Sequence, residues 1–275
     1  MYKEGNVWRF FAVTLLWSWG LLLVPVVNGL GLDMGVTRIL FALAGVAPSL
    51  VAILIVLRGG NGTYRNDFFK RIVDFKRIGS KWYLLIFFLV PLTGLLSVLL
   101  NYLFVGQWQD FSTFNMFLSE PLYLFVFMIF TLFFGPLAEE IGWRGYATDQ
   151  MNEYYHWLIC CLVIGFFWAL WHLPMYFIEG TYQWQLAQGS IIDIVLYNVE
   201  KFSTSIIMFW IYKNTRRSIL ADILYHFSQN FFGEILDLSP AVTQLQTGIQ
   251  IMIAILIVVL NFKRFAPEKI SKKLN

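Results

Sequence analysis

Eight apolar runs, each about 20 residues long, constrain what this chain can fold into. A helix needs about 20 apolar residues to cross a hydrocarbon layer roughly 30 Å thick. Backbone groups have no water to bond in lipid, so such runs must form helices or closed barrels. The alternation typical of barrel strands is absent. The sequence therefore predicts an all-α, polytopic transmembrane bundle of about eight helices, at approximately 8–28, 37–57, 82–104, 121–142, 157–178, 191–212, 218–237 and 246–262.

The composition favours one integral membrane domain over residues 1–275, with the lipid bilayer as its surroundings. Of the residues, 58% are hydrophobic and 13% are charged, against roughly 45–50% and about 25% in soluble domains. The spans use almost all of the chain and leave no room for a soluble domain. The apolar run after Arg9 is long enough to span and lacks a small-residue cleavage site, so we interpret it as an uncleaved first helix.

Basic residues predict how the bundle sits in the membrane, because short cytoplasmic loops are enriched in Lys and Arg. With eight spans and both termini inside, eighteen basic residues face the cytoplasm and only Arg38 faces outward, while Lys201 falls within a span. An N-in, C-in topology is therefore predicted. The basic residues are divided among several loops, so nucleic acid is not an expected partner.

Ionisable residues within the predicted spans are the candidates for function, because each costs several kcal/mol unless it has a partner or a purpose. There are nine of them: Glu139, Glu140, His172, Asp193, Glu200, Lys201, Asp222, His226 and Glu234.

Two adjacent carboxylates, Glu139 and Glu140, lie at the end of the fourth span. Neighbouring helical residues point about 100° apart, so the two cannot share one task. Arg144 follows Glu140 by four residues, the spacing of an ion pair along a helix. We predict a structural pair between Glu140 and Arg144, with Glu139 facing the interior as a general base. The alternative is that both are interfacial charges near a helix end.

Spans five and seven add polar groups on single helix faces. Trp168 and His172 are one turn apart on span five, where a lone histidine is more often a core residue than a catalyst. Asp222, His226, Asn230 and Glu234 recur every four residues along span seven. Such a stripe must face protein or a wet cavity. We expect interhelical hydrogen bonds from Asp222 and Glu234, and a site role for His226 and Asn230.

Glu139, His172, His226 and Asn230 form one candidate constellation, and two schemes fit it. In the first, Glu139, His172 and His226 bind a divalent metal such as zinc, with a position left open for water. In the second, no cofactor is needed: Glu139 and His172 activate water, while His226 and Asn230 donate to the oxyanion. Either scheme hydrolyses an amide within the membrane. A nucleophile mechanism is poorly supported, because no Gly-x-Ser-x-Gly occurs and neither cysteine has an evident base.

The three motifs resemble those of the CPBP family, the Abi or CAAX-protease-like group of intramembrane proteases, which is related to the eukaryotic Rce1-type enzyme. They are Glu-Glu-x-x-x-Arg at 139–144, aromatic-x-x-x-His at 168–172 and His-x-x-x-Asn at 226–230. The likeness covers about residues 120–235, which is spans four to seven. Trp168 stands where the second motif more often has phenylalanine.

The resemblance implies an endopeptidase of the cell membrane with its site open to the cytoplasm. It implies that Glu139 activates water, that His172, His226 and Asn230 complete the site, and that the substrate is a lipidated or membrane-associated peptide. Many relatives are linked to bacteriocin production or immunity, so a non-catalytic immunity or binding protein is the alternative. An ion-coupled transporter is a third hypothesis, although no pair of matching broken helices is evident.

The depths of these residues in straight spans conflict with a common site. At 1.5 Å per residue, Glu139 would lie roughly 4 Å from the inner face, His226 roughly 12 Å and His172 roughly 22 Å. They can meet only if helix four shifts outward or continues past Glu140 through Trp143 to about Asn152, and if helix five starts deeper or tilts. Gly135 and Pro136 favour a bend in helix four. We predict that the Glu139 carboxylate lies within about 8 Å of both imidazole rings.

Overall fold

The computed structural model describes residues 5–59 and 61–265. Every regular element among these residues is helical, as the apolar runs predict. The helices are α1 (Gly5–Asn28), α2 (Gly35–Gly45), α3 (Ala47–Gly59), α4 (Gly62–Val73), η1 (Phe75–Arg77), α5 (Ser80–Val105), α6 (Ser112–Ser119), α7 (Pro121–Phe133), α8 (Pro136–Glu140), η2 (Ile141–Ala147), α9 (Thr148–Asn152), α10 (Trp157–Trp171), η3 (Leu173–Phe177), α11 (Tyr182–Gln188), α12 (Ile191–Asn214), α13 (Ile219–Leu236) and α14 (Pro240–Asn261).

The all-α polytopic bundle is confirmed, and its helices fall close to the predicted spans. Six helices in the described part of the chain are long and apolar enough to cross a membrane, or seven if α2 and α3 form one bent span. The remaining expected span, α13, is a helix of 18 residues. It is not among those six or seven, because the polar stripe from Asp222 to Glu234 lowers its hydropathy. The count of eight crossings therefore stays a prediction.

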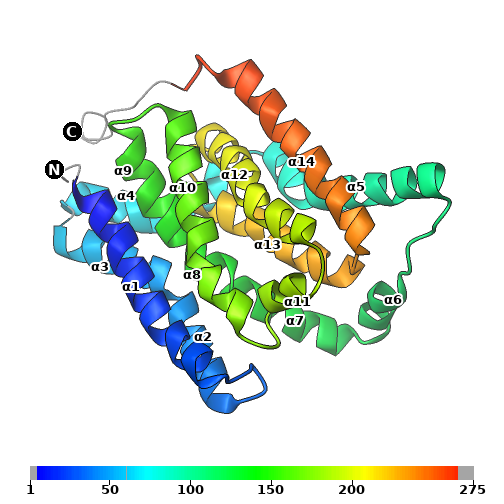
Figure 1. The fold of residues 1–275 in the computed structure, drawn as a ribbon. Coiled ribbons are helices and arrows are strands. Elements are labelled where there is room, and N and C mark those ends of the chain that lie inside the picture. Colours follow the sequence, from blue (N-terminus) through cyan, green and yellow to red (C-terminus); the bar gives the residue numbers. More distant parts are fainter. Residues whose placement is uncertain (1–4, 60, 266–275) are drawn as a thin grey trace.

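The helices α1, α10, α12 and α14 run across the bundle in that spatial order (Figure 1). α13 packs against α5, α8 and α12, and α8 also contacts α3 and α7. These contacts place α8, which carries both motif carboxylates, in the interior of the bundle. α5 and α6 extend to one side of it (Figure 1).

The fourth span continues beyond its predicted end at residue 142, which is one of the two alternatives that the depth argument allows. It runs from Pro121 to Asn152 over 32 residues, with a turn at Phe134 and Gly135 before Pro136 begins α8. Immediately after Glu140, residues Ile141–Ala147 form a π-helix. Single π turns in otherwise α-helical spans are frequent at functional sites. The extension moves Glu139 from the end of a span into its interior.

A proline explains the 42° bend between α2 and α3. Pro48 has no amide hydrogen, so it leaves the carbonyl of Ala44 without its helical donor. The Ser18 hydroxyl donates to that carbonyl at 2.8 Å. The same hydroxyl accepts a 2.7 Å hydrogen bond from the indole of Trp171. The bend thereby fixes α1 against the end of α10, next to His172.

A buried ion cluster holds the end of the long fourth span to its neighbours. Asp149 is 1% exposed and accepts hydrogen bonds from Arg71 of α4 and Arg217 of the α12–α13 turn, each at 2.6 Å. The Tyr212 hydroxyl also donates to Asp149. Asp149 thus ties α9 to α4, to the last turns of α12 and to the turn after it.

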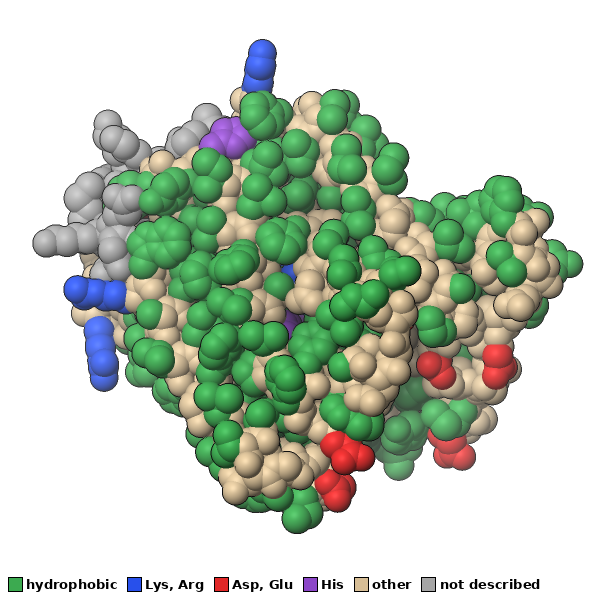
Figure 2. All heavy atoms as spheres, in the orientation of Figure 1, with side chains coloured by type: hydrophobic (Ala, Val, Ile, Leu, Met, Phe, Trp, Pro, Cys, Tyr) green, Lys and Arg blue, Asp and Glu red, His purple; other side chains and the backbone are tan. Residues whose placement is uncertain are grey.

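The outer surface is apolar, as expected of helices in contact with lipid. Figure 2 shows hydrophobic side chains across most of the visible face, with Lys and Arg toward the upper and left edges and Asp and Glu toward the lower edge. The chain is an integral, multi-pass membrane protein. Its N-in, C-in orientation stays a prediction, because some residues that carry it lie outside the described residues: Lys3, Lys269, Lys272 and Lys273.

Candidate active site

The Glu139 carboxylate points into the bundle and is held by Trp168. It is 6% exposed, and its Oε2 accepts a 2.7 Å hydrogen bond from the Trp168 indole nitrogen. Trp168 is 2% exposed, and its ring lies 5.3 Å from the ring of His226 and 6.3 Å from that of His172, centroid to centroid. One indole therefore contacts residues from all three sequence motifs.

Glu140 forms the predicted ion pair with Arg144 and also binds His226. The Arg144–Glu140 separation is 3.0 Å, and Nδ1 of His226 donates to Glu140 Oε1 at 2.7 Å. The guanidinium of Arg144 lies 4.3 Å from the centroid of the Trp168 ring. Glu140 is fully buried, so its partners are protein groups, Arg144 and His226, rather than water. The pair is structural, and it orients one of the two site histidines.

His172 reaches the site from the end of α10, one turn after Trp168. Its Nδ1 lies 2.7 Å from the backbone carbonyl of Trp168. A carbonyl only accepts, so Nδ1 carries the proton and Nε2 is left with a lone pair. The ring also stands edge-on to Tyr197, 5.8 Å between centroids. His172 is therefore a fixed ring that can accept a proton.

Asn230 lies beside the first turn of α8. A Cβ on Gly135 would stand 2.9 Å from Asn230 Nδ2, so any residue with a side chain at position 135 would displace this amide. Asn230 is one helical turn from His226 on α13, and Gly135 is four residues before Glu139. The amide therefore lies close to the backbone one turn before Glu139.

The group of potential metal ligands differs from the predicted one. Within the described part of the chain, Glu139, Glu140 and His226 each offer a ligand atom within 4.8 Å of the others. His172 is not in this group. The expected set of Glu139, His172 and His226 therefore stays a prediction.

The distance prediction for Glu139 is confirmed for one imidazole. The Glu139 and His226 ligand atoms lie within 4.8 Å of one another, inside the predicted 8 Å. For His172, whose ring centroid lies 6.3 Å from that of Trp168, the 8 Å limit stays a prediction. The two histidines themselves are nearly buried, at 8% and 5% exposed. Near the centre of the face in Figure 2, a histidine and a basic side chain are visible between apolar groups.

Two of the expected interhelical hydrogen bonds are absent. Neither carboxylate oxygen of Asp222, a fully buried residue, has a hydrogen-bond partner among the described residues. Glu234 is exposed rather than packed between helices. A stripe with four-residue spacing drifts around the helix, because 3.6 residues make one turn. The two ends of the stripe therefore face different surroundings from the middle.

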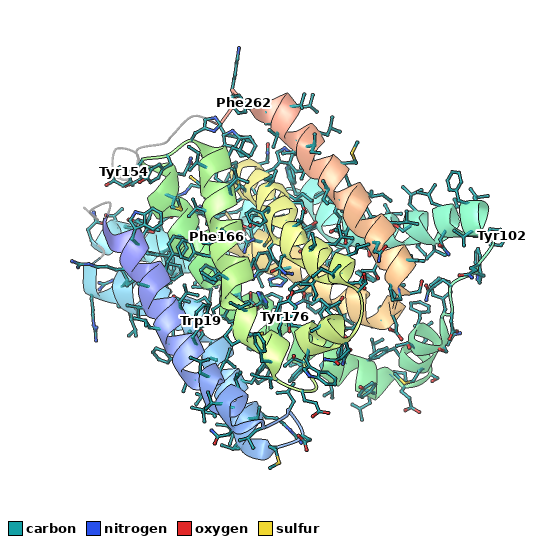
Figure 3. The ribbon with its side chains drawn as sticks, in the orientation of Figure 1. Trp19, Tyr102, Tyr154, Phe166, Tyr176 and Phe262 are labelled. Atoms are coloured by element: carbon teal, nitrogen blue, oxygen red, sulfur yellow. The ribbon has the colours of Figure 1, made fainter. Side chains whose placement is uncertain are left out.

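Sequence reasoning missed the contribution of α12. Tyr197 and Lys201 lie one turn apart on this helix, and the Lys201 ammonium stands 3.9 Å from the Tyr197 ring centroid and 5.0 Å from that of Trp168. Figure 3 shows side chains filling the space between α10 and α12, with Tyr176 labelled at one end of it. Tyr176 accepts from Asn198 of α12 at 2.8 Å. The four-residue spacing of an aromatic ring and a lysine within one span was the available signal.

The fold is that of a polytopic helical membrane protein, and inside it two carboxylates and an imidazole lie within 4.8 Å of one another. The sequence model of the family described as type II CAAX prenyl endopeptidase Rce1-like matches residues 121–232. A CAAX prenyl protease 2 of Methanococcus maripaludis is 30% identical over 220 residues, which is 80% of this chain and 80% of that protein. The chain belongs to the Rce1-like CAAX prenyl endopeptidase family, within the CPBP group that its motifs resemble.

Proposed function

We propose that this protein hydrolyses a peptide bond near the C-terminus of a prenylated, membrane-bound protein, with Glu139 activating the water. The observation that carries the proposal is the buried carboxylate of Glu139, held by Trp168 and within 4.8 Å of His226. A general base must lie within reach of the proton that it abstracts, and its protein contacts must leave room for water. Among the described residues, Glu139 accepts one hydrogen bond, at Oε2 from Trp168, and its Oε1 can accept one from the water.

In the proposed reaction, Glu139 takes a proton from water while the oxygen attacks the carbonyl carbon. His172 assists by accepting a hydrogen bond from the water through Nε2. His226, held at Nδ1 by Glu140, and Asn230 direct N–H groups to the oxyanion, an arrangement worth roughly 3–4 kcal/mol per donor in other hydrolases. The proton then passes from Glu139 to the leaving amine as the C–N bond breaks, which balances the hydrolysis.

The contacts of Glu140 argue against a metal ion held by Glu139, Glu140 and His226. Nδ1 of His226 and one oxygen of Glu140 are already bound to each other, and the Arg144 guanidinium lies 3.0 Å from the Glu140 carboxylate. A divalent cation held by Glu140 would stand close to that guanidinium and be repelled by it. A zinc ion held by Glu139, His172 and His226 is the alternative.

The test compares the wild type with E139Q and H226A, purified in detergent, on a labelled peptide that ends in a prenylated Cys-aliphatic-aliphatic-X sequence. Both variants should lose at least about a hundredfold in kcat/KM, since a general base contributes roughly 10²–10⁴. E120Q is the matched control: Glu120 is exposed at the start of the same span, and its rate should equal that of the wild type.

Three results decide between the hypotheses. A wild type that cleaves no member of a broad lipidated peptide panel would support the immunity or binding protein instead. Cleavage that persists in E139Q would remove Glu139 from the mechanism. Activity lost to a chelator and restored by zinc, with about one metal ion per chain in the purified protein, would favour the metal scheme.

We also propose that the protein resides in the cell membrane and that the site opens toward the cytoplasm. The support is the eighteen-to-one distribution of basic residues between the predicted sides. Labelling of single cysteines introduced at Arg38 and Lys76 in intact cells tests it. Only the cysteine at position 38 should react with an impermeant reagent applied from outside the cell.

A further inference from the structure

A lysine ammonium lies inside the bundle beside the proposed catalytic groups. Lys201 is near the middle of α12, a helix of 24 residues, and its side chain is 12% exposed. Its ammonium stands 3.9 Å from the centroid of the Tyr197 ring and 5.0 Å from that of Trp168. Cation–π contacts of this kind stabilise a desolvated ammonium only in part.

The anion nearest to Lys201 is a poor partner for it. Among the described residues, its ion pair is with the adjacent Glu200 at 4.0 Å, the outer limit for such a contact, and Glu200 is 25% exposed. An ionisable residue in the middle of a membrane span is expensive and marks a functional site unless it is well paired. Lys201 therefore has no close anionic partner among the described residues.

Close packing of α10 on α12 holds Lys201 at the site. A Cβ on Gly165 would stand 2.9 Å from Phe202 Cα and 3.1 Å from the Lys201 carbonyl oxygen. The absence of a side chain at position 165 lets the two backbones approach. As a result, Lys201 faces Trp168, which is less than one turn beyond Gly165 on α10.

Lys201 and Glu139 contact the same indole ring. Trp168 donates to Glu139 at 2.7 Å, and its ring centroid is 5.0 Å from the Lys201 ammonium. These two contacts and the width of the indole ring place the Glu139 carboxylate and the Lys201 ammonium no more than about 10 Å apart. Three extended residues span about this length. A substrate cut by water at Glu139 can therefore place a group three residues downstream at Lys201.

We infer that Lys201 binds the free C-terminal carboxylate of the substrate and so fixes the position of the cut. The inference rests on the proposed function. A Cys-aliphatic-aliphatic-X terminus has apolar side chains after the lipidated cysteine, and its one charge there is the terminal carboxylate. That carboxylate loses water when it enters the bundle, and a charge-assisted hydrogen bond from an ammonium offsets the loss.

Two peptides that differ only at the C-terminus test the inference. Both carry the same prenylated cysteine and label; one ends in a free acid and the other in a carboxamide. The wild type should cleave the acid at least about tenfold better in kcat/KM, the lower end of the range for a hydrogen bond to a charged group. K201M should lose this preference, because it should cleave the acid peptide more slowly than the wild type and the amide peptide at nearly the wild-type rate.

Two further variants serve as controls. K201R keeps a cation at this position and should retain a preference for the acid, although a smaller one because the guanidinium is larger and planar. K213M removes a lysine from the same helix, where its ammonium donates to Asn152 at 3.3 Å. It should keep the wild-type ratio of acid to amide. Thermal melting of each variant reports whether it is folded.

The outcomes separate the inference from the proposed function. If the wild type cleaves acid and amide equally, or if K201M keeps the wild-type ratio, Lys201 does not bind the carboxylate, although the protease assignment stands. If K201M slows both peptides equally, Lys201 acts through Trp168 or through the charge of Glu139, and the inference is wrong. If the wild type cleaves neither peptide, the proposed function fails and the inference fails with it.

Discussion

Removing the Arg144 guanidinium should destabilise the protein strongly. In R144M, the fully buried carboxylate of Glu140 would lose its cation at 3.0 Å and keep only His226. Removing one partner of a buried ion pair costs about 3–5 kcal/mol. For a chain of this size, that corresponds to a fall of roughly 6–20 °C in the apparent melting temperature.

Thermal melting of the purified protein in detergent measures this change, and a double variant checks its cause. In E140Q/R144M no charge is left without a partner, and a buried pair replaced by neutral groups of similar size costs little. The double variant should therefore recover most of the melting temperature lost in R144M. A melting temperature of R144M within about 2 °C of the wild type, or a double variant no more stable than R144M, would falsify the reasoning.

Two further predictions concern buried carboxyl groups outside the reaction. D149N removes the carboxylate that lies 2.6 Å from both Arg71 and Arg217, while Asp67 remains at 3.1 Å and 3.5 Å from them. The melting temperature should therefore fall, but by less than the roughly 6–20 °C expected for a buried charge with no partner. D33N, on an exposed loop, should leave it unchanged, and equal melting of the two variants would contradict this prediction. D222N should leave the melting temperature unchanged or raise it, because the Asp222 carboxyl oxygens have no hydrogen-bond partner among the described residues. A fall of more than about 5 °C in D222N would show that the carboxyl group has a partner after all.

Local patterns predicted the parts of the site that lie on one helix. The four-residue spacing from Glu140 to Arg144 was sufficient to predict their ion pair, which the structure has at 3.0 Å. The depth conflict between Glu139 and the histidines left two alternatives for the fourth span, an outward shift or an extension to about Asn152, and the span ends at Asn152. Both predictions depend on helix geometry alone, which is the same in every protein.

Contacts between helices were not predictable in the same way. The stripe on α13 was visible in the sequence, but it did not distinguish His226, which binds Glu140, from Asp222, which has no hydrogen-bond partner among the described residues. Which end of a stripe meets a partner depends on where the neighbouring helix crosses. That crossing is set by packing details such as the missing side chains at Gly135 and Gly165, and periodicity does not report them.

The sequence by itself determined that the chain is a membrane-embedded helical bundle, because its apolar runs have no other stable arrangement in lipid. It also indicated a site in that bundle, because the motif residues are too costly in a membrane to be there without a purpose. Only the tertiary structure decided how that site is built: Glu139 on the Trp168 indole, His226 on Glu140, and Lys201 on the far helix. Those pairings depend on the angle and register between helices, which arise from the packing of the whole bundle.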